Sequence, residues 1–189
     1  MVLQNADHFI FSKKKYMLRH LSIRKARPSD GEFATLCVRK LTKLAEGFKV
    51  LPEIKNINKC WDSIMNDKKS IAFVAEDNGN PVGIGVCSFN YELHRGGEVC
   101  VLQDLFVDDA ARKTGAGKKL LSHVEKYAKN HGMVSVDLNQ PPPGSAYDDI
   151  RSRFYQKNGY ETVGMGRTKQ FYKIWSIPED GDNVNDNKL

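Results

Sequence analysis

Apolar residues follow two different periods along the chain, and each period predicts its own kind of element. Alternation at every second position is typical of strands, and recurrence every three to four positions is typical of amphipathic helices. The alternating or continuously apolar runs predict strands at 21–26, 71–76, 82–89, 98–107, 133–138, 160–165 and 169–175. The helical runs predict helices at 30–46, 53–65, 117–131 and 146–157.

Residues with capping and turn chemistry lie at the borders of these runs. Ser29 is a predicted N-cap, Glu32 stands where a capping box places its carboxylate, and Gly47 is a predicted helix stop. Residues 77–80 read Asp-Asn-Gly-Asn, which is typical of a tight β-hairpin turn. The prolines at 141–143 exclude a strand there, because proline has no N–H for the sheet ladder.

The element order β-α-α-β-β-β-α-β-α-β-β, without an internal repeat, predicts an α/β fold with a mixed (α+β) sheet and helices on its faces. We expect one domain at 20–175, after an N-terminal extension at 1–19. An acidic, Asn-rich tail at 176–189 is expected to be disordered. The short apolar patch at 8–11 precedes three lysines, which is the opposite order to a secretory signal, and no run is long enough to cross a membrane.

The chain has 189 residues and a net charge of +6 that is spread unevenly. The first 60 residues carry 13 Lys and Arg against 5 Asp and Glu. A basic surface attracts phosphorylated small molecules as well as nucleic acid. No motif that interleaves basic and aromatic residues supports nucleic acid, so we expect no nucleic-acid partner.

The four cysteines, Cys37, Cys60, Cys87 and Cys100, form no Cys-x-x-Cys pair, and no His spacing completes a zinc site. We therefore expect reduced thiols in a cytoplasmic or nuclear protein, and no metal site.

Residues 112–118, Arg-Lys-Thr-Gly-Ala-Gly-Lys, lie between a predicted strand and a predicted helix. The first N–H groups of a helix have no intrahelical acceptor and the helix dipole adds positive charge, so such a turn favours an anion. Gly115 and Gly117 allow a phosphate to approach the backbone closely, and Arg112, Lys113 and Lys118 add full charges. Neither the Walker spacing nor the dinucleotide-binding fingerprint occurs here.

The stretch 112–117 fits the pattern Arg/Gln-x-x-Gly-x-Gly/Ala and resembles the acetyl-CoA motif of the GNAT superfamily of N-acetyltransferases. It follows the strand-like run VLQDLFV, and RFYQKNGY at 153–160 is similar to the helix end Phe-Tyr-x-x-x-Gly-Phe/Tyr of that family. The resemblance covers roughly residues 20–175. It implies a GNAT fold, a mostly antiparallel twisted sheet of about seven strands with helices on both faces. Splayed central strands would hold coenzyme A, with acetyl-CoA as the co-substrate.

The resemblance also implies roles for residues around the motif. Leu105, Phe106 and Val107 match the strand that pairs with the pantetheine arm, and the N–H of Leu105 would stabilise the oxyanion of the thioester carbonyl. Leu105 and Val107 are equally suited to be ordinary core residues. The CoA phosphates would contact Arg112, Lys113, Thr114, Gly115, Ala116, Gly117 and Lys118.

Tyr155 matches the tyrosine that in many members protonates the departing CoA thiolate, although simple packing is the alternative. Arg151 lies one turn earlier on the same helix face, where the family often has a small residue. We hypothesise that Arg151 lowers the pKa of the Tyr155 phenol or contacts the CoA phosphates. Asp148 replaces a frequent asparagine.

The attacking amine must lose a proton, because an alkylamine with a pKa near ~10.4 is almost fully charged at neutral pH. Many relatives use Glu or His at the position of Gln103, which cannot act as a base. Asp104 is the best substitute, and Glu98 and Glu92 are weaker candidates. Strand alternation places Gln103 and Asp104 on opposite faces unless a bulge re-aims one of them. Asp104 could instead be a structural carboxylate that binds backbone N–H groups.

The leading hypothesis is an acetyltransferase that moves an acetyl group from acetyl-CoA to a primary amine by direct attack in a ternary complex. The DLFV carboxylate is similar to small-amine and polyamine acetylating members, which favours a polyamine, an amino acid or a similar amine. Two alternatives stay open: a protein or peptide acetyltransferase, and a catalytically weak acyl-CoA-binding regulatory module. No membrane partner is expected, and a homodimer is compatible with the family.

Overall fold

The computed structural model describes residues 20–44, 52–141, 144–145 and 147–163. These residues form the strands β1 (Leu21–Lys25), β2 (Ser70–Asp77), β3 (Asn80–Glu92), β4 (Gly97–Val107) and β5 (Ser135–Leu138). The α-helices are α1 (Gly31–Leu44), α2 (Ile54–Asn66), α3 (Ala116–Asn130) and α4 (Asp148–Lys157). The short 3₁₀ turns are η1 (Pro28–Asp30), η2 (Leu93–Arg95) and η3 (Asp109–Ala111). Up to α4 the order is the one predicted from hydrophobic periodicity.

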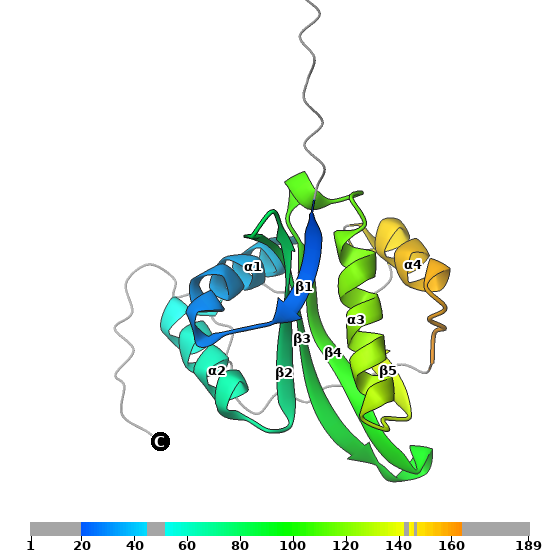
Figure 1. Cartoon of the computed structure of the whole chain (residues 1–189). Helices are drawn as coiled ribbons and strands as arrows, with labels where there is room; N and C mark the ends of the chain where they lie inside the picture. Colours follow the sequence, from blue (N-terminus) through cyan, green and yellow to red (C-terminus); the bar gives the residue numbers. More distant parts are fainter. Residues whose placement is uncertain (1–19, 45–51, 142–143, 146, 164–189) are drawn as a thin grey trace, which may run out of the picture.

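The described strands form one mixed sheet in the order β1-β2-β3-β4-β5. Neighbours are antiparallel from β1 to β4, and β5 lies parallel to β4. Figure 1 shows α1 and α2 on one side of this sheet and α3 and α4 on the other. The expected mostly antiparallel sheet with helices on both faces is confirmed. Of the two further strands expected, residues 160–163 form no strand, and the rest of 160–165 and all of 169–175 lie outside the described residues.

Each face of the sheet carries its own apolar core. The side chains under α3 include Phe73, Cys87, Cys100, Leu102, Leu120, Leu121 and Val124. The side chains under α1 and α2 include Cys37, Trp61, Val74, Ile84 and Phe106. Because both cores meet β4, its side chains divide between two separate environments. Within the described ranges, no helix has the length and apolarity that a membrane crossing requires.

The start of α1 differs from the predicted one. The 3₁₀ turn η1 precedes α1 and has Arg27, not Ser29, as its N-cap; Asp30 is the residue that reaches back, and its Oδ2 accepts a hydrogen bond from the N–H of Arg27 at 2.7 Å. Arg24 holds the same carboxylate with Nη1 and Nη2 at 2.8 and 2.9 Å. The predicted capping box of Ser29 and Glu32 was therefore wrong, because a guanidinium from β1 fixes a different carboxylate at the helix start. The predicted stop at Gly47 lies outside the described residues.

Other local predictions agree with the structure. Asn78 and Gly79 have φ values of 53° and 81°, as a tight hairpin turn between β2 and β3 requires. Cys37, Cys87 and Cys100 are buried, Cys60 is exposed, and all four thiols are free, as expected. The predicted extension at 1–19 and tail at 176–189 lie outside the described residues, so the domain boundaries stay predictions.

Candidate active site

β4 changes its register at Gln103. Its Cα partners on β3 are Cys87 for Leu102 and Val86 for Asp104, so Gln103 is an extra residue and forms a β-bulge. The bulge reverses which positions face which core: Leu102 and Leu105 both pack with the core under α3, whereas Phe106 belongs to the core under α1 and α2. Strand alternation alone would place Gln103 and Asp104 on opposite faces of the sheet. The bulge at Gln103 changes this alternation.

The bulge brings Gln103 and Asp104 to the same face of the sheet. Gln103 Nε2 donates a hydrogen bond of 2.8 Å to Ser88 Oγ. Ser88 lies between Cys87 and Phe89, which both belong to the core under α3, so Ser88 points to the opposite face. Asp104 lies on that face too: burial raises the pKa of the Cys37 thiol of α1, and the charge of Asp104 adds a smaller contribution in the same direction.

The Asp104 side chain is half-buried, and its carboxylate has no hydrogen-bond or ion-pair partner among the described residues. Burial alone raises the pKa of its carboxyl group above the ordinary value. A carboxylate that served to bind backbone N–H groups would have donors around it and a lowered pKa. The described residues therefore do not supply the backbone N–H contacts that a purely structural role of Asp104 would require.

The two weaker base candidates are already paired. Glu98 forms an ion pair with Lys69, whose Nζ also lies 4.4 Å from the ring centroid of Tyr91. Glu92 Oε2 lies 3.1 Å from Arg95 Nε at the far end of the β3–β4 hairpin. Among these three acids, Asp104 alone is both half-buried and unpaired in the described part of the chain.

From Gln103 onward, β4 has no β5 neighbour on one side. The parallel pairing with β5 ends at Leu102 and Leu138. Residues Leu105, Phe106 and Val107 pair with β3 only, so their other backbone edge has no β5 partner. An open strand edge of this kind accepts an extended ligand in the way it would accept another strand.

The turn after β4 has the backbone geometry expected of an anion site. Lys113 and Gly115 have positive φ values of 63° and 92°, and Gly115 is the N-cap of α3. Thr114 Oγ1 donates a 2.6 Å hydrogen bond to the carbonyl of Ala111, which ties the turn back to η3. Ala116 is buried and anchors the first turn of α3, while Lys118 is exposed.

Two ion pairs hold this turn in place. Arg112 Nη1 lies 2.7 Å from Asp109 Oδ1, and Arg112 Nε donates to the carbonyl of Val107 at 3.3 Å. Lys40 Nζ of α1 lies 3.0 Å from Asp108 Oδ2. Lys40 is a residue that sequence reasoning missed, because a contact between positions 68 residues apart leaves no local signal. Ser88, the partner of Gln103, was missed for the same reason.

α4 reaches the same region through Phe154. A Cβ atom on Gly117 would lie 3.6 Å from both Phe154 Cζ and Val107 Cγ2, so the end of β4, the start of α3 and the middle of α4 converge there. Tyr155 follows Phe154, packs against the core under α3, and has its ring centroid 5.2 Å from that of Phe154. Burial raises the pKa of the Tyr155 phenol to about 12.

Arg151 is engaged within the first turn of its own helix. Its Nη2 lies 3.3 Å from Asp148 Oδ1 and donates to Ser145 Oγ at 2.9 Å. The charge of Arg151 does act to lower the pKa of Tyr155, but burial outweighs it. In the described part of the chain no cluster of three His, Cys, Asp or Glu side chains offers a metal site.

Comparisons with known proteins identify the family. Residues 38–160 match the acetyltransferase (GNAT) family. The chain is 25% identical over 142 residues to the uncharacterized N-acetyltransferase YhfO of Bacillus subtilis (strain 168), which covers 75% of this chain and 90% of that protein.

Solved structures show the same fold. The aminoglycoside N-acetyltransferase AAC(6')-Iy in complex with CoA has a TM-score of 0.64 and 20% identity, over 80% of this chain and 95% of its own. A possible acetyltransferase from Clostridium difficile 630 has a TM-score of 0.67 and 18% identity, over 80% of this chain and 99% of its own. Since the family match spans well over half of the sequence, the chain belongs to the acetyltransferase (GNAT) family.

Proposed function

We propose that this protein transfers the acetyl group of acetyl-CoA to the primary amine of a small molecule such as a polyamine or an amino acid. The observation that carries the proposal is Asp104, a half-buried carboxylate with no side-chain partner among the described residues, on the stretch of β4 that has no β5 neighbour. A carboxylate in this state attracts a cationic amine and is free to accept a proton from it.

The residues around the end of β4 fit the donor. Lys113 and Gly115 adopt the left-handed backbone conformation in the turn before α3. The first N–H groups of α3 have no intrahelical acceptor and would bind a pyrophosphate. Arg112, Lys113 and Lys118 would add charge, and the edge of Leu105 to Val107 would take the pantetheine arm. When bound, acetyl-CoA supplies the activated acetyl group.

The chain's own groups then have separate tasks. Asp104 would accept the proton of the incoming ammonium group directly or through a water molecule, and its raised pKa makes it a stronger base than an exposed aspartate. The N–H of Leu105 would donate to the thioester carbonyl oxygen as charge develops there. Tyr155, which stays protonated because its pKa is about 12, would give its proton to the departing sulfur.

The test is the release of free thiol from acetyl-CoA against polyamines, amino acids, aminoglycosides and histone-like peptides. Wild type is compared with Asp104→Asn and with Asp62→Asn, an exposed aspartate of α2 that serves as a matched control. We expect turnover with one class of small amine, its loss in Asp104→Asn and its retention in Asp62→Asn. Turnover with peptides alone would point to a protein acetyltransferase. Binding of acetyl-CoA without any turnover would point to an acyl-CoA-binding module.

A further inference from the structure

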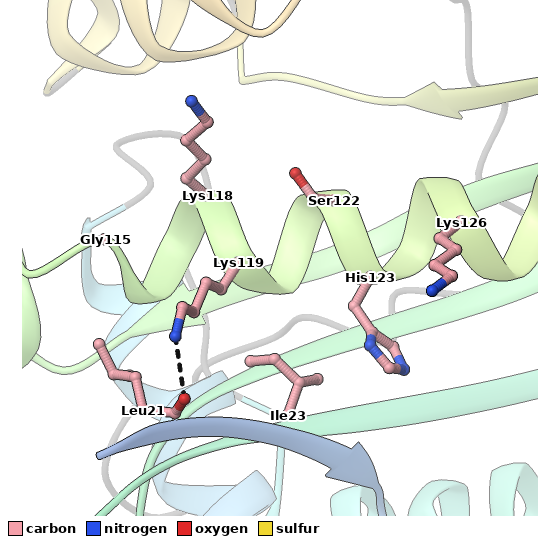
Figure 2. Close-up of a pocket in the computed structure, with 8 residues that line it drawn as sticks. All are labelled: Leu21, Ile23, Gly115, Lys118, Lys119, Ser122, His123 and Lys126. Atoms are coloured by element: carbon pink, nitrogen blue, oxygen red, sulfur yellow. Dashed lines mark hydrogen bonds between the residues drawn. The ribbon is translucent and has the colours of Figure 1, made fainter.

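A second basic site lies on the other side of α3 from α4. An open groove of about 600 Å³ runs between β1 and α3 (Figure 2). It is lined by Leu21, Ile23, Gly115, Lys118, Lys119, Ser122, His123 and Lys126. Three of these eight residues are lysines and none is acidic, so an anion is the ligand that the charge favours.

The groove has an apolar floor and a cationic rim. Leu21 and Ile23 of β1 supply the floor, and Figure 2 shows Lys119, His123 and Lys126 turned from α3 toward β1. Lys119 Nζ donates a 3.0 Å hydrogen bond to the carbonyl of Leu21, which fixes this ammonium group at one end of the groove. Lys126 is exposed farther along α3.

His123 gives the groove a flat, uncharged wall. Its ring makes an edge contact with Phe73 at a centroid distance of 4.7 Å, which holds its orientation. Burial and the neighbouring Lys126 lower the pKa of His123 below the ordinary value, so the imidazole is neutral at pH 7. A neutral ring beside an apolar floor favours a planar or apolar ligand part, whereas the lysines favour phosphate.

The groove meets the proposed acetyl-CoA site at Gly115 and Lys118 and extends away from it along α3. The proposed donor site lies at the open edge of β4 and reaches Phe154 of α4. In Figure 2 the side chain of Lys118 points away from β1, opposite to Lys119. Lys126 lies more than two helical turns beyond the phosphate turn, since a helix rises only about 1.5 Å per residue.

We propose that this groove binds a second organic phosphate of nucleotide size, with its phosphate groups on Lys119 and Lys126 and its planar part on His123 and the floor of Leu21 and Ile23. The volume suits such a ligand, because small-molecule sites commonly span roughly 300–1,000 Å³. A phosphate held here would lie near the turn of residues 112–118. It would therefore weaken acetyl-CoA binding through repulsion between like charges.

The test is calorimetric titration of ADP into protein that has first been saturated with CoA, so that the donor site cannot take the nucleotide. We expect one further ADP to bind, and to bind more tightly than inorganic phosphate does. Lys126→Gln should weaken ADP binding about tenfold, which corresponds to about 1.4 kcal/mol for one charge-assisted contact. Lys119→Gln should weaken it in the same direction.

Lys129→Gln is the matched control, because Lys129 is an exposed lysine of the same helix that does not line the groove. Lys126→Gln and Lys129→Gln each remove one positive charge. A difference between their affinities for ADP therefore comes from the position of Lys126 in the groove and not from the change in net charge. The proposal is overturned if CoA-saturated protein binds no ADP, if Lys126→Gln and Lys129→Gln lose affinity equally, or if phosphate binds as tightly as ADP. The preceding CoA titration tests the donor site separately, so failure of either site is recognised independently.

Discussion

The two halves of β4 differ in their neighbours and in what they carry. The first half, through Leu102, pairs with β3 on one side and β5 on the other, and Val99, Cys100 and Leu102 are buried. Among the described strands, the second half, from Gln103, pairs with β3 alone, and it carries the half-buried Asp104, whose carboxylate has no partner in the described part of the chain. The first half of β4 thus contributes to the stability of the sheet, and the second half provides an unpaired strand edge and the Asp104 carboxylate. The bulge at Gln103 separates the two halves.

Two carboxylates in the second half and the following turn show how the surroundings decide their state. Burial raises the pKa of the Asp104 carboxyl group. Asp108, four positions later, has its pKa lowered by Lys40 and by backbone N–H groups. An aspartate carboxylate therefore accepts a proton more readily at position 104, whereas at position 108 it stays ionised and anchors the turn.

The largest expected effect comes from Asp104→Asn. If Asp104 is the base, kcat/KM should fall about 10²- to 10⁴-fold, the usual contribution of a positioned general base. The free energy of unfolding of the variant, in contrast, should rise. The folded pKa of Asp104 is raised, so the ionised carboxylate disfavours the fold once the pH rises above that pKa.

The measurements are steady-state kinetics and urea unfolding at pH 7 and pH 3.5. We expect the variant to be more stable than wild type at pH 7, with the difference shrinking at pH 3.5. A variant that keeps its activity within a few-fold would remove Asp104 from the mechanism.

Leu102→Ala tests the paired half of the strand. Leu102 is 2% exposed, and truncation of a buried leucine costs about 2–5 kcal/mol. Urea unfolding should show this loss, while kcat per folded molecule changes little. The neighbouring Gln103→Ala is the contrast, because Gln103 is exposed and loses only its bond to Ser88. Equal losses in the two variants would contradict the division of β4.

Tyr155→Phe should lower kcat about 10²-fold, as removal of a general acid does, with a smaller change in the KM for acetyl-CoA. Because burial raises the pKa of Tyr155 to about 12, its deprotonation should cause no alkaline decline in the rate up to pH 10. The pH–rate profiles of both proteins check this. A variant with unchanged kcat would leave Tyr155 with a packing role.

Arg151→Ala should raise the pKa of Tyr155 further, because the guanidinium acts to lower it, or raise the KM for acetyl-CoA by a few-fold if Arg151 contacts the CoA phosphates. NMR titration of ring-labelled tyrosine and steady-state kinetics check the two effects. If neither quantity changes, Arg151 serves only to order the first turn of α4 with Asp148 and Ser145.

The smallest expected effect is that of Asp108→Asn. Lys40 and Asp108 are both partly exposed, so their bridge should contribute no more than about 1 kcal/mol. The folded pKa of Asp108 is lowered, so this contribution is present above the unfolded pKa and is lost as the pH falls through the folded one. Unfolding measured between pH 7 and pH 3 should show a dependence opposite in sign to that of Asp104. If both substitutions changed the pH dependence of unfolding in the same direction, the contrast between Asp104 and Asp108 would be contradicted.

Much of the fold followed from local patterns in the sequence. Apolar periodicity located every described strand and helix to within a few residues, and the Asn-Gly pair specified the tight turn between β2 and β3. The capping at the start of α1 was assigned to the wrong residues, because Ser29 lies inside η1 and Asp30 makes the bond to the N-cap N–H. Arg24 of β1 holds the Asp30 carboxylate in place, and this contact between two elements leaves no local signal in the sequence.

The sequence by itself determined the elements, the glycine-containing turn at 112–118 and the family motif, because hydrophobic period and permitted φ angles are properties of neighbouring residues. Only the tertiary structure decided that Gln103 is the bulged residue, that Asp104 is half-buried with no donor among the described residues and that Lys40 holds Asp108. It also decided that Lys119, His123 and Lys126 face β1 across a groove. The physical reason is that register, desolvation and charge pairing depend on which distant segments pack together.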